Sequence, residues 1–506
     1  MNMCTRTLVG MWIAGMASAQ SVSPKSDEKK EKHAVVVQTP KKTGFDVGGD
    51  LRLRYDWYDN LPSGPGKIDP GYADVAVIRT RVWGKYDFTK DFGIYARIAD
   101  EFRVYHHYDD FNAKKPKNNY NRFPDEVFID NLYMDINNIA DLVSLRIGRQ
   151  DMKYGAKRII SDGTPSDGTR SAYFNAAKAT FKVTDKTSSD VFAIYSPPKD
   201  QWPTLWGANK NGEYDYPYYL TSPDGNFTSD KDDDLTEWAV GNYWTIQEQK
   251  DFPVEAYAIW KDESRWYKGG QPQTTTKEVP GRHYVTLGTR LNPKLTDTLS
   301  AEFEGAYQAG RTEKGTKEDA QNISAFMLYG GVTYQTKEVF MKPYITPAVL
   351  FLSGDDDRTA YNKAGGPADT VTGWNPVFAR ETGIGNLPVK MYGSSYRWSN
   401  LIWPYGESGI TPLKGHAFKV QSGPMFAVED DTGLGTTTDK YRGWYTILVY
   451  EATLIKGAFG KRGDIKSRLQ AEQMVYGDYQ GVSTEPATTD VPGAGYYLRA
   501  ELSMSF

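Results

Sequence analysis

Apolar and polar residues alternate along much of this chain. At the C-terminal end the apolar residues take every second position: Tyr496, Leu498, Ala500, Leu502, Met504 and Phe506. Near the start an apolar series alternates with a charged one: Phe45, Val47, Leu51 and Leu53 against Asp50, Arg52 and Arg54. A period of two predicts β-strands that are apolar on one face and polar on the other.

The same reasoning predicts about 18 strands. We place them at 45–57, 78–88, 94–103, 125–136, 142–150, 173–183, 189–196, 235–246, 253–266, 282–291, 298–309, 322–335, 339–352, 396–403, 416–428, 442–457, 464–477 and 495–506. The chain is therefore expected to be all-β.

The predicted connections alternate between long and short. Long ones cover 59–72, 197–234 and 353–395, whereas Thr89-Lys90-Asp91 and Asn292-Pro293-Lys294 are tight turns, as are the segments around 249–251 and 336–338. A soluble β-sandwich would bury its apolar faces between two sheets and has no reason to alternate in this way. Short turns opposite long loops indicate a transmembrane antiparallel up-and-down β-barrel of about 18 strands, within a range of about 16–20, with lipid outside and a polar lumen inside. We assign 43–506 to it.

Composition agrees with this class. A hydrophobic fraction of 39% and a mean hydropathy of −0.60 exclude a bundle of membrane helices. Aromatic residues still reach 14%, and those near strand ends fit interfacial girdles: Trp57, Tyr58, Trp260, Trp266, Trp398, Trp403 and Trp444. A single cysteine excludes a disulfide scaffold, and a formal charge of −4 argues against nucleic acid as a partner.

The N-terminus has the three regions of a secretory signal peptide. Arg6 precedes the apolar run 8–14 and the small-residue site Ala17-Ser18-Ala19, so we assign 1–19 to the signal peptide rather than to a short core helix. Residues 20–42 are rich in charge and are expected to be a flexible periplasmic leader, with a partner-binding arm as the alternative. Export would bring the chain to the outer membrane of a Gram-negative-type bacterium.

Arginine dominates the polar face of the early strands: Arg52, Arg54, Arg79, Arg81, Arg97, Arg103 and Arg146. Guanidinium groups bind carboxylates through paired hydrogen bonds, and rings of them favour anions in a pore. Acidic residues are interleaved, notably Asp50, Asp56, Asp87 and Glu101. Pairing across strands that merely holds the wall together is therefore the alternative.

Several motifs occur in the order typical of one family. They are Arg52-Leu53-Arg54-Tyr55, Arg79-Thr80-Arg81, Gly148-Arg149-Gln150, Tyr154-Gly155 and Arg158. In these the sequence resembles the alginate export porin family, and the terminal Phe506 resembles the signal read by the barrel-assembly machinery. The resemblance implies an outer-membrane pore with an electropositive conduit for an anionic polysaccharide, lined also by Arg149 and Arg158. After Arg158 the chain departs from the family pattern, in the loop that would narrow the pore.

Three functions follow as expectations. The first is a channel for anionic saccharide or polysaccharide, the second a general or substrate-specific small-solute porin, and the third a barrel enzyme or adhesin. No Gly-x-Ser-x-Gly, His-Glu-x-x-His or phosphate-loop pattern is present, so we expect no enzyme. The expected partners are membrane lipid and lipopolysaccharide. No cofactor is expected, and Asp230, Asp232, Asp234 and Glu237 are only weak calcium candidates because they lack EF-hand spacing.

Overall fold

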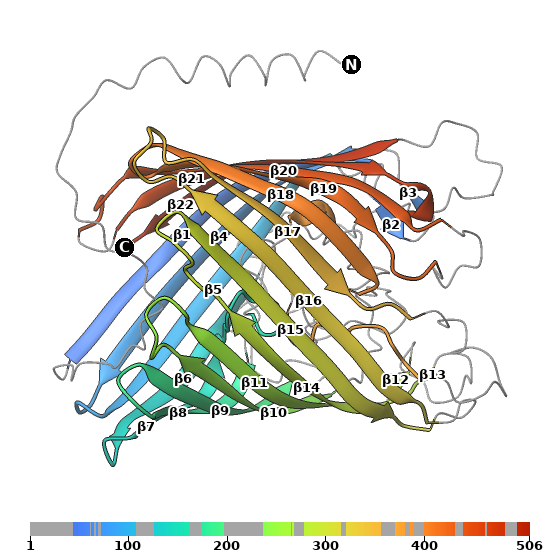
Figure 1. The fold of residues 1–506 in the computed structure, drawn as a ribbon. Helices are drawn as coiled ribbons and strands as arrows, with labels where there is room; N and C mark the ends of the chain where they lie inside the picture. The colour runs from blue at the N-terminus through green and yellow to red at the C-terminus, as the bar shows by residue number, and fades with distance from the viewer. Residues whose placement is uncertain are drawn as a thin grey trace. The chain divides into compact units, whose positions relative to one another are not determined.

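The strands close into one antiparallel barrel (Figure 1). The structure is a computed structural model that describes residues 44–60, 62–64, 67–68, 72–107, 126–161, 174–196, 236–264, 266–267, 278–314, 320–355, 370–379, 385–388, 399–430, 439–460, 463–480 and 493–506. The predicted signal peptide and leader lie outside these residues.

Eighteen strands form the sheet. They are β1 (Gly44–Asp59), β4 (Tyr72–Asp87), β5 (Phe92–His107), β6 (Glu126–Ile139), β7 (Val143–Gln150), β8 (Phe174–Lys182), β9 (Thr187–Ser196), β10 (Glu237–Ile246), β11 (Val254–Glu263), β14 (Arg282–Leu291), β15 (Leu299–Thr312), β16 (Asn322–Gln335), β17 (Tyr344–Leu352), β18 (Leu401–Leu413), β19 (His416–Phe426), β20 (Tyr441–Ile455), β21 (Ile465–Tyr476) and β22 (Ala494–Ser505). Between them lie two small hairpins, β2 (Pro62–Gly64) with β3 (Lys67–Ile68) and β12 (Trp266–Tyr267) with β13 (Glu278–Val279), and the short 3₁₀ turn η2 (Asp478–Gln480).

The last strand closes the barrel onto the first. β22 pairs antiparallel with β1, with Leu502 opposite Leu53. The terminal Phe506 exchanges two backbone hydrogen bonds with Gly49, at 2.9 and 3.0 Å. Every strand of the sheet therefore has two hydrogen-bonded neighbours, and no backbone edge is left to be satisfied in hydrocarbon.

The period of two sets which face of each strand points outward. In β1 the side chains of Arg52, Arg54 and Asp56 are buried, whereas Phe45 on the alternate face is 70% exposed. No second sheet covers the exposed apolar face in the described chain, so that face meets lipid. The prediction of an all-β transmembrane barrel with about 18 strands is confirmed.

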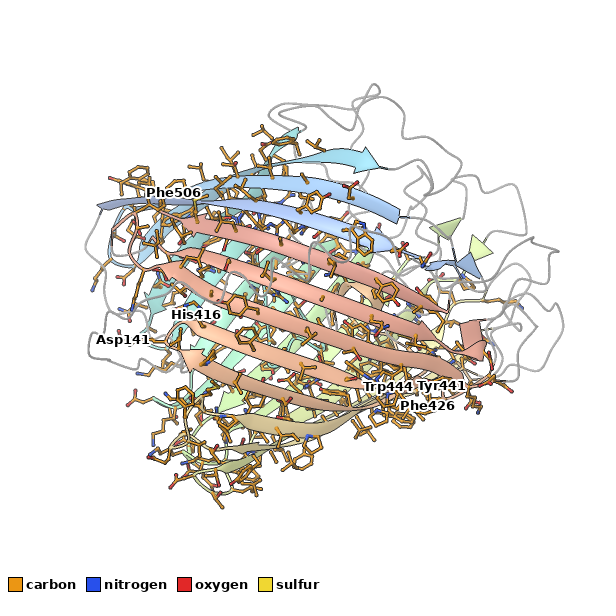
Figure 2. All side chains as sticks on the ribbon, turned by 90° about the horizontal axis from the view of Figure 1, so that it is seen from above. Asp141, His416, Phe426, Tyr441, Trp444 and Phe506 are labelled. Carbon is orange, nitrogen blue, oxygen red and sulfur yellow. The ribbon has the colours of Figure 1, made fainter. Side chains whose placement is uncertain are left out.

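Short turns gather at one end of the barrel. Residues 88–91, 140–142 and 414–415 join neighbouring strands there, and Figure 2 shows Asp141, His416 and Phe506 at that end and Phe426, Tyr441 and Trp444 at the opposite one. The long connections follow the opposite end. Because short turns are periplasmic in outer-membrane barrels, this fixes the orientation of the pore. No helix in the described ranges is long and apolar enough to cross a membrane.

Three predicted strands have ends that differ from the structure by five residues or more. The strand expected at 78–88 begins already at Tyr72. The strand expected at 339–352 begins only at Tyr344, because Met341 and Lys342 have positive φ angles and precede Pro343 in a longer turn. The strand expected at 396–403 is instead Leu401–Leu413. Pro404 predicts a strand end, but it lies inside this strand, where the pairing with β19 is interrupted between Ile402 and Gly406. The strand therefore tolerates a residue that has no N–H group to donate.

Two of the expected girdle residues face inward. Tyr58 and Trp403 are buried in the interior cluster, whereas Trp260 and Trp444 are exposed on the outer face as expected. The side chains of Trp266 and Trp398 lie outside the described part. Aromatic residues near strand ends thus divide between the membrane interface and the interior, according to the face on which they fall.

A charge on the outer face should be costly. Leu287 lies in the middle of β14 and is 53% exposed toward lipid. We expect Leu287→Lys to lower the free energy of unfolding by about 2–4 kcal/mol, since a cation at this depth must be desolvated. The measurement is urea unfolding of the barrel in phospholipid vesicles. Leu295→Lys, in the turn after β14, is the control and should have little effect; equal effects would contradict the lipid assignment.

Candidate conducting pore

The chain after β7 turns into the barrel interior. In this segment, 151–161, the Tyr154 ring stacks on Tyr243 of β10, with centroids 4.4 Å apart, and its hydroxyl donates to Asp190 of β9 at 2.8 Å. Gly155 has a φ of 53°, and a Cβ there would lie 2.8 Å from the Tyr243 hydroxyl. Both the left-handed backbone and the close approach require glycine at this point.

Arg158 fixes the far end of the same segment. Its Nη1 atom donates to Glu302 and Glu304 of β15, at 2.7 Å each. The guanidinium carbon also lies 3.5 Å from the ring centroid of Tyr329 on β16. Charge pairing and a cation–π contact together hold 151–161 against the inner wall.

A second inward segment, 371–379, lies between β17 and β18. The Lys261 Nζ atom donates to the carbonyl oxygen of Val377 at 2.7 Å. The same ammonium group lies 2.6 Å from Glu237 and 2.9 Å from Glu263, and it is almost fully buried. One buried cation therefore joins two wall carboxylates to this segment.

Two further contacts anchor the connection between β17 and β18. Asn375 exchanges hydrogen bonds with Gln308 of β15: its amide donates to Gln308 Oε1 at 3.0 Å, and Gln308 Nε2 donates to its carbonyl at 2.7 Å. At 385–388 the amides of Asn386 and Leu387 each donate to the buried Glu472 carboxylate at 2.7 Å. All of these wall residues project inward from the sheet, which places the anchored segments inside the barrel.

The two inward segments bond to each other. The Phe378 amide donates to the Ile159 carbonyl at 3.0 Å, and the Ser161 amide donates to the Phe378 carbonyl at 3.3 Å. The Phe378 ring meets Phe174 of β8 edge to face, with centroids 5.6 Å apart. We call residues 151–161, 371–379 and 385–388 the constriction segments. They narrow the interior at the height where they meet.

Around these segments the interior is not polar throughout. Several apolar side chains face inward and are buried against them or beside them: Phe192, Ile259, Met327, Leu350 and Leu401. The polar lumen expected from the sequence is therefore interrupted by a packed region. Burial of this apolar surface stabilises the folded connections inside the barrel.

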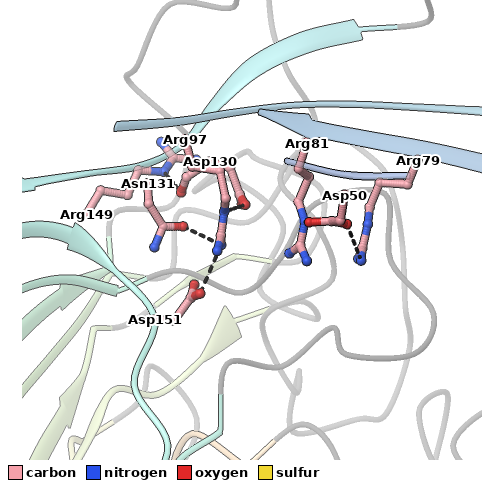
Figure 3. Close-up of polar contacts among 8 residues, drawn as sticks. All are labelled: Asp50, Arg79, Arg81, Arg97, Asp130, Asn131, Arg149 and Asp151. Carbon is pink, nitrogen blue, oxygen red and sulfur yellow. Dashed lines mark hydrogen bonds and ion pairs between the residues drawn. The ribbon is translucent and has the colours of Figure 1, made fainter. Parts of the chain in front are cut away.

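The predicted Arg79 and Arg81 converge on one acid (Figure 3). Arg81 Nε lies 2.8 Å from the Asp50 carboxylate, and Arg79 Nη2 lies 3.5 Å from it. All three side chains come from the inward-facing positions of β1 and β4. The Arg81 side chain remains 21% exposed in this arrangement.

A second group in Figure 3 joins Arg97 and Arg149 to the start of the constriction. Arg97 bonds to Asp130, to Asn131 at 2.6 Å and to Asp151 at 2.9 Å. The buried Arg149 donates from Nε to the Asp130 carbonyl at 3.2 Å. These residues link the β5–β6–β7 wall to the segment that follows it.

The other predicted arginines are distributed along the same wall. Arg54 and Arg499 share the buried Asp56 carboxylate, each at 2.9 Å, and Arg52 is buried on the same face of β1. Arg146 pairs with Asp135 at 2.7 Å and stays 28% exposed. Arg103 belongs to β5, but its side chain is outside the described part. Many of the arginines thus pair with the interleaved acids, as expected if these pairs only hold the barrel wall together. Contact between the arginines and a solute stays a prediction.

Sequence reasoning missed several residues that shape the interior: Lys261, Glu263, Arg282, Glu304 and Glu472. Their alternation with lipid-facing neighbours such as Trp260 could have revealed them as inward-facing. Of the calcium candidates, Glu237 lies in β10 and pairs with Lys261, while Asp230, Asp232 and Asp234 are outside the described residues. Among the described side chains no group of three or more metal-binding residues comes together, and the calcium expectation stays a prediction.

A closed antiparallel barrel with an apolar outer face and charged interior side chains defines an outer-membrane channel protein. Residues 44–379 match the family described as alginate export, and the chain belongs to that family. It therefore resides in the outer membrane of a Gram-negative-type bacterium. No curated protein matches the chain by sequence.

Solved porin structures from Pseudomonas aeruginosa are similar in fold. OccK8 (OprE) is 11% identical with a TM-score of 0.53, covering 91% of this chain and 98% of its own. OpdK with vanillate is 10% identical with a TM-score of 0.51, covering 92% and 100%. OpdQ is 12% identical with a TM-score of 0.50, covering 91% and 97%. At these identities the similarity shows the barrel fold alone.

Proposed function

We propose that this channel passes an anionic saccharide or polysaccharide, and that inward-facing arginines contact it. The observation that carries the proposal is that Arg81 and Arg146 are paired with acids yet keep exposed fractions of 21% and 28%. A guanidinium group held by a carboxylate stays charged and has further N–H donors for a passing anion. Such contacts are individually weak, which suits conduction rather than trapping. Membership of the alginate export family supports the same substrate class.

Charge reversal on the wall tests this proposal. In planar bilayers we expect the native channel to prefer anions and to be blocked by alginate oligomers. The Arg79→Glu/Arg81→Glu variant should lower the anion-to-cation permeability ratio about three- to tenfold, because two cations near Asp50 become anions. The reversal potential in a salt gradient gives the ratio directly.

The matched control reverses two exposed charges outside the barrel wall. Lys294→Glu/Lys337→Glu changes the turns after β14 and β16 and should leave the ratio unchanged. Cation preference in the native channel, or an equal shift in the control, would contradict a selective arginine wall.

A small-solute porin is the second candidate. The pairing of Arg54, Arg97 and Arg158 with acids favours it, since neutralised charges impose less selectivity. The fold is also that of OpdK, which was solved with vanillate, a small carboxylate. Conduction of small solutes with no block by alginate oligomers would select this function over the first.

A further inference from the structure

Three aromatic rings and a guanidinium group form a row across the inner wall. The rings of Trp83 on β4 and Tyr95 on β5 are stacked, with centroids 5.9 Å apart and planes at 23°. Tyr95 and Tyr133 on β6 are stacked at 4.8 Å and 14°. Arg146 on β7 completes the row, with its guanidinium carbon 4.0 Å from the Tyr133 centroid. We call these four residues the aromatic row.

The rings stand upright on the wall. Tyr95 and Tyr133 are directly opposite in the register, and their centroid separation equals the spacing between neighbouring strands. Their faces therefore cover each other, and their edges and hydroxyl groups point away from the sheet. Trp83 lies over Gly48 of β1, where a Cβ would come within 2.5 Å of the indole. The glycine leaves room for the indole to keep its place in the row.

The hydroxyl groups of this row differ from those of other inward-facing tyrosines. Tyr154, Tyr243, Tyr257 and Tyr344 each donate to a carboxylate, at 2.8 to 3.1 Å. Neither Tyr95 nor Tyr133 forms a hydroxyl–carboxylate hydrogen bond within the described ranges. The Tyr95 hydroxyl oxygen does accept a hydrogen bond from Arg97. Because a guanidinium group can only donate, both tyrosines keep an O–H donor for a solute.

The row lies on the periplasmic side of the constriction segments. Trp83 and Tyr95 lie four and three residues from the strand ends Asp87 and Phe92, which the short turn between β4 and β5 joins. Tyr133 and Arg146 lie six and three residues from the strand ends Ile139 and Val143, which the turn between β6 and β7 joins. The constriction segments begin after the opposite end of β7. A solute coming from the periplasm would meet the row first.

We propose that the aromatic row is a contact site for the uronate units of an acidic polysaccharide at the periplasmic mouth. This deepens the proposed function and rests on it. Ring edges carry partial positive charge, phenol hydroxyl groups both donate and accept, and Arg146 is already paired with Asp135 at 2.7 Å. The carboxylates and hydroxyl groups of a sugar can therefore form several weak contacts along the row. Because Arg146 is already paired, the row does not bind a carboxylate tightly.

The test is current block of the purified full-length channel by an alginate trisaccharide added on the periplasmic side. Tyr95→Phe/Tyr133→Phe keeps both rings and removes both hydroxyl groups, so it should weaken the block about five- to tenfold. Trp83→Leu should weaken it in the same direction by removing the end of the stack. Tyr344→Phe is the matched control, because this inward-facing tyrosine also lies over a glycine, Gly409, but donates to Glu407; its block should equal that of the native channel.

The outcomes separate this inference from the proposed function. An unchanged block in the double Phe variant, in a channel that prefers anions and is blocked by the trisaccharide, overturns the row and leaves the proposed function standing. If maltotriose, a neutral sugar, also blocks the native channel and the double Phe variant weakens that block equally, the assignment to uronates is overturned. A native channel that neither prefers anions nor is blocked overturns both.

Discussion

Replacing Lys261 by methionine should destabilise the barrel by about 3–5 kcal/mol and raise its conductance. The Lys261 ammonium group neutralises Glu237 and Glu263 and donates to Val377, all away from water. Its removal leaves two buried carboxylates with one fewer cation and takes away one of the wall contacts that hold the 371–379 segment. Urea unfolding in vesicles measures the first effect, and single-channel conductance in bilayers measures the second.

The control is another inward-facing lysine in an ion pair. Lys178 lies 3.5 Å from Asp190 and is 26% exposed, so water screens the pair. Lys178→Met should cost less than about 1 kcal/mol and leave conductance nearly unchanged. If Lys261→Met behaves like this control, the segment is not held by the buried cation.

Replacing Arg158 by alanine should also cost about 3–5 kcal/mol and widen the pore. The side chain joins Glu302 and Glu304 at 2.7 Å and covers the Tyr329 ring. Without it, residues 151–161 lose their attachment to β15 and β16. Arg158→Lys should fall between the native chain and alanine, because an ammonium group keeps the charge but lacks the planar fork.

Lys157→Ala, in the same segment, is the control for Arg158→Ala, since no ion pair is recorded for Lys157 within the described residues. It should change neither stability nor conductance appreciably. Residues 151–161 and 371–379 bond to each other through Phe378, so Lys261→Met and Arg158→Ala should be non-additive in stability. Simple additivity would show that the segments are held independently.

The candidate site was only partly readable from the sequence. Alternation placed Arg52, Arg79 and Arg146 on the inward face because side-chain direction in a strand depends only on parity. It gave no partner for Arg158, which lies beyond the end of β7 and meets acids on β15. That contact depends on how the loop folds back through the closed barrel.

The same limit explains the buried apolar residues inside the pore. Ile259 is inward-facing and fully buried, although the barrel model predicts a polar lumen. It belongs to the same buried cluster as Val377 and Phe378 of the constriction segments. The course of those segments is set by contacts such as Lys261 with Val377 that join distant parts of the chain. No local pattern encodes them.

The sequence by itself determined the class of this protein, a membrane barrel, and the face on which each strand residue lies. Strand periodicity and the lengths of connections are local properties, so they can be recognised in the sequence without the tertiary structure. Only the closed structure decided which long connections enter the pore, which charges they bind and which tyrosine hydroxyl groups stay available. These depend on the register around the whole barrel, where residues distant in sequence become neighbours in a medium that penalises any buried charge left without a partner.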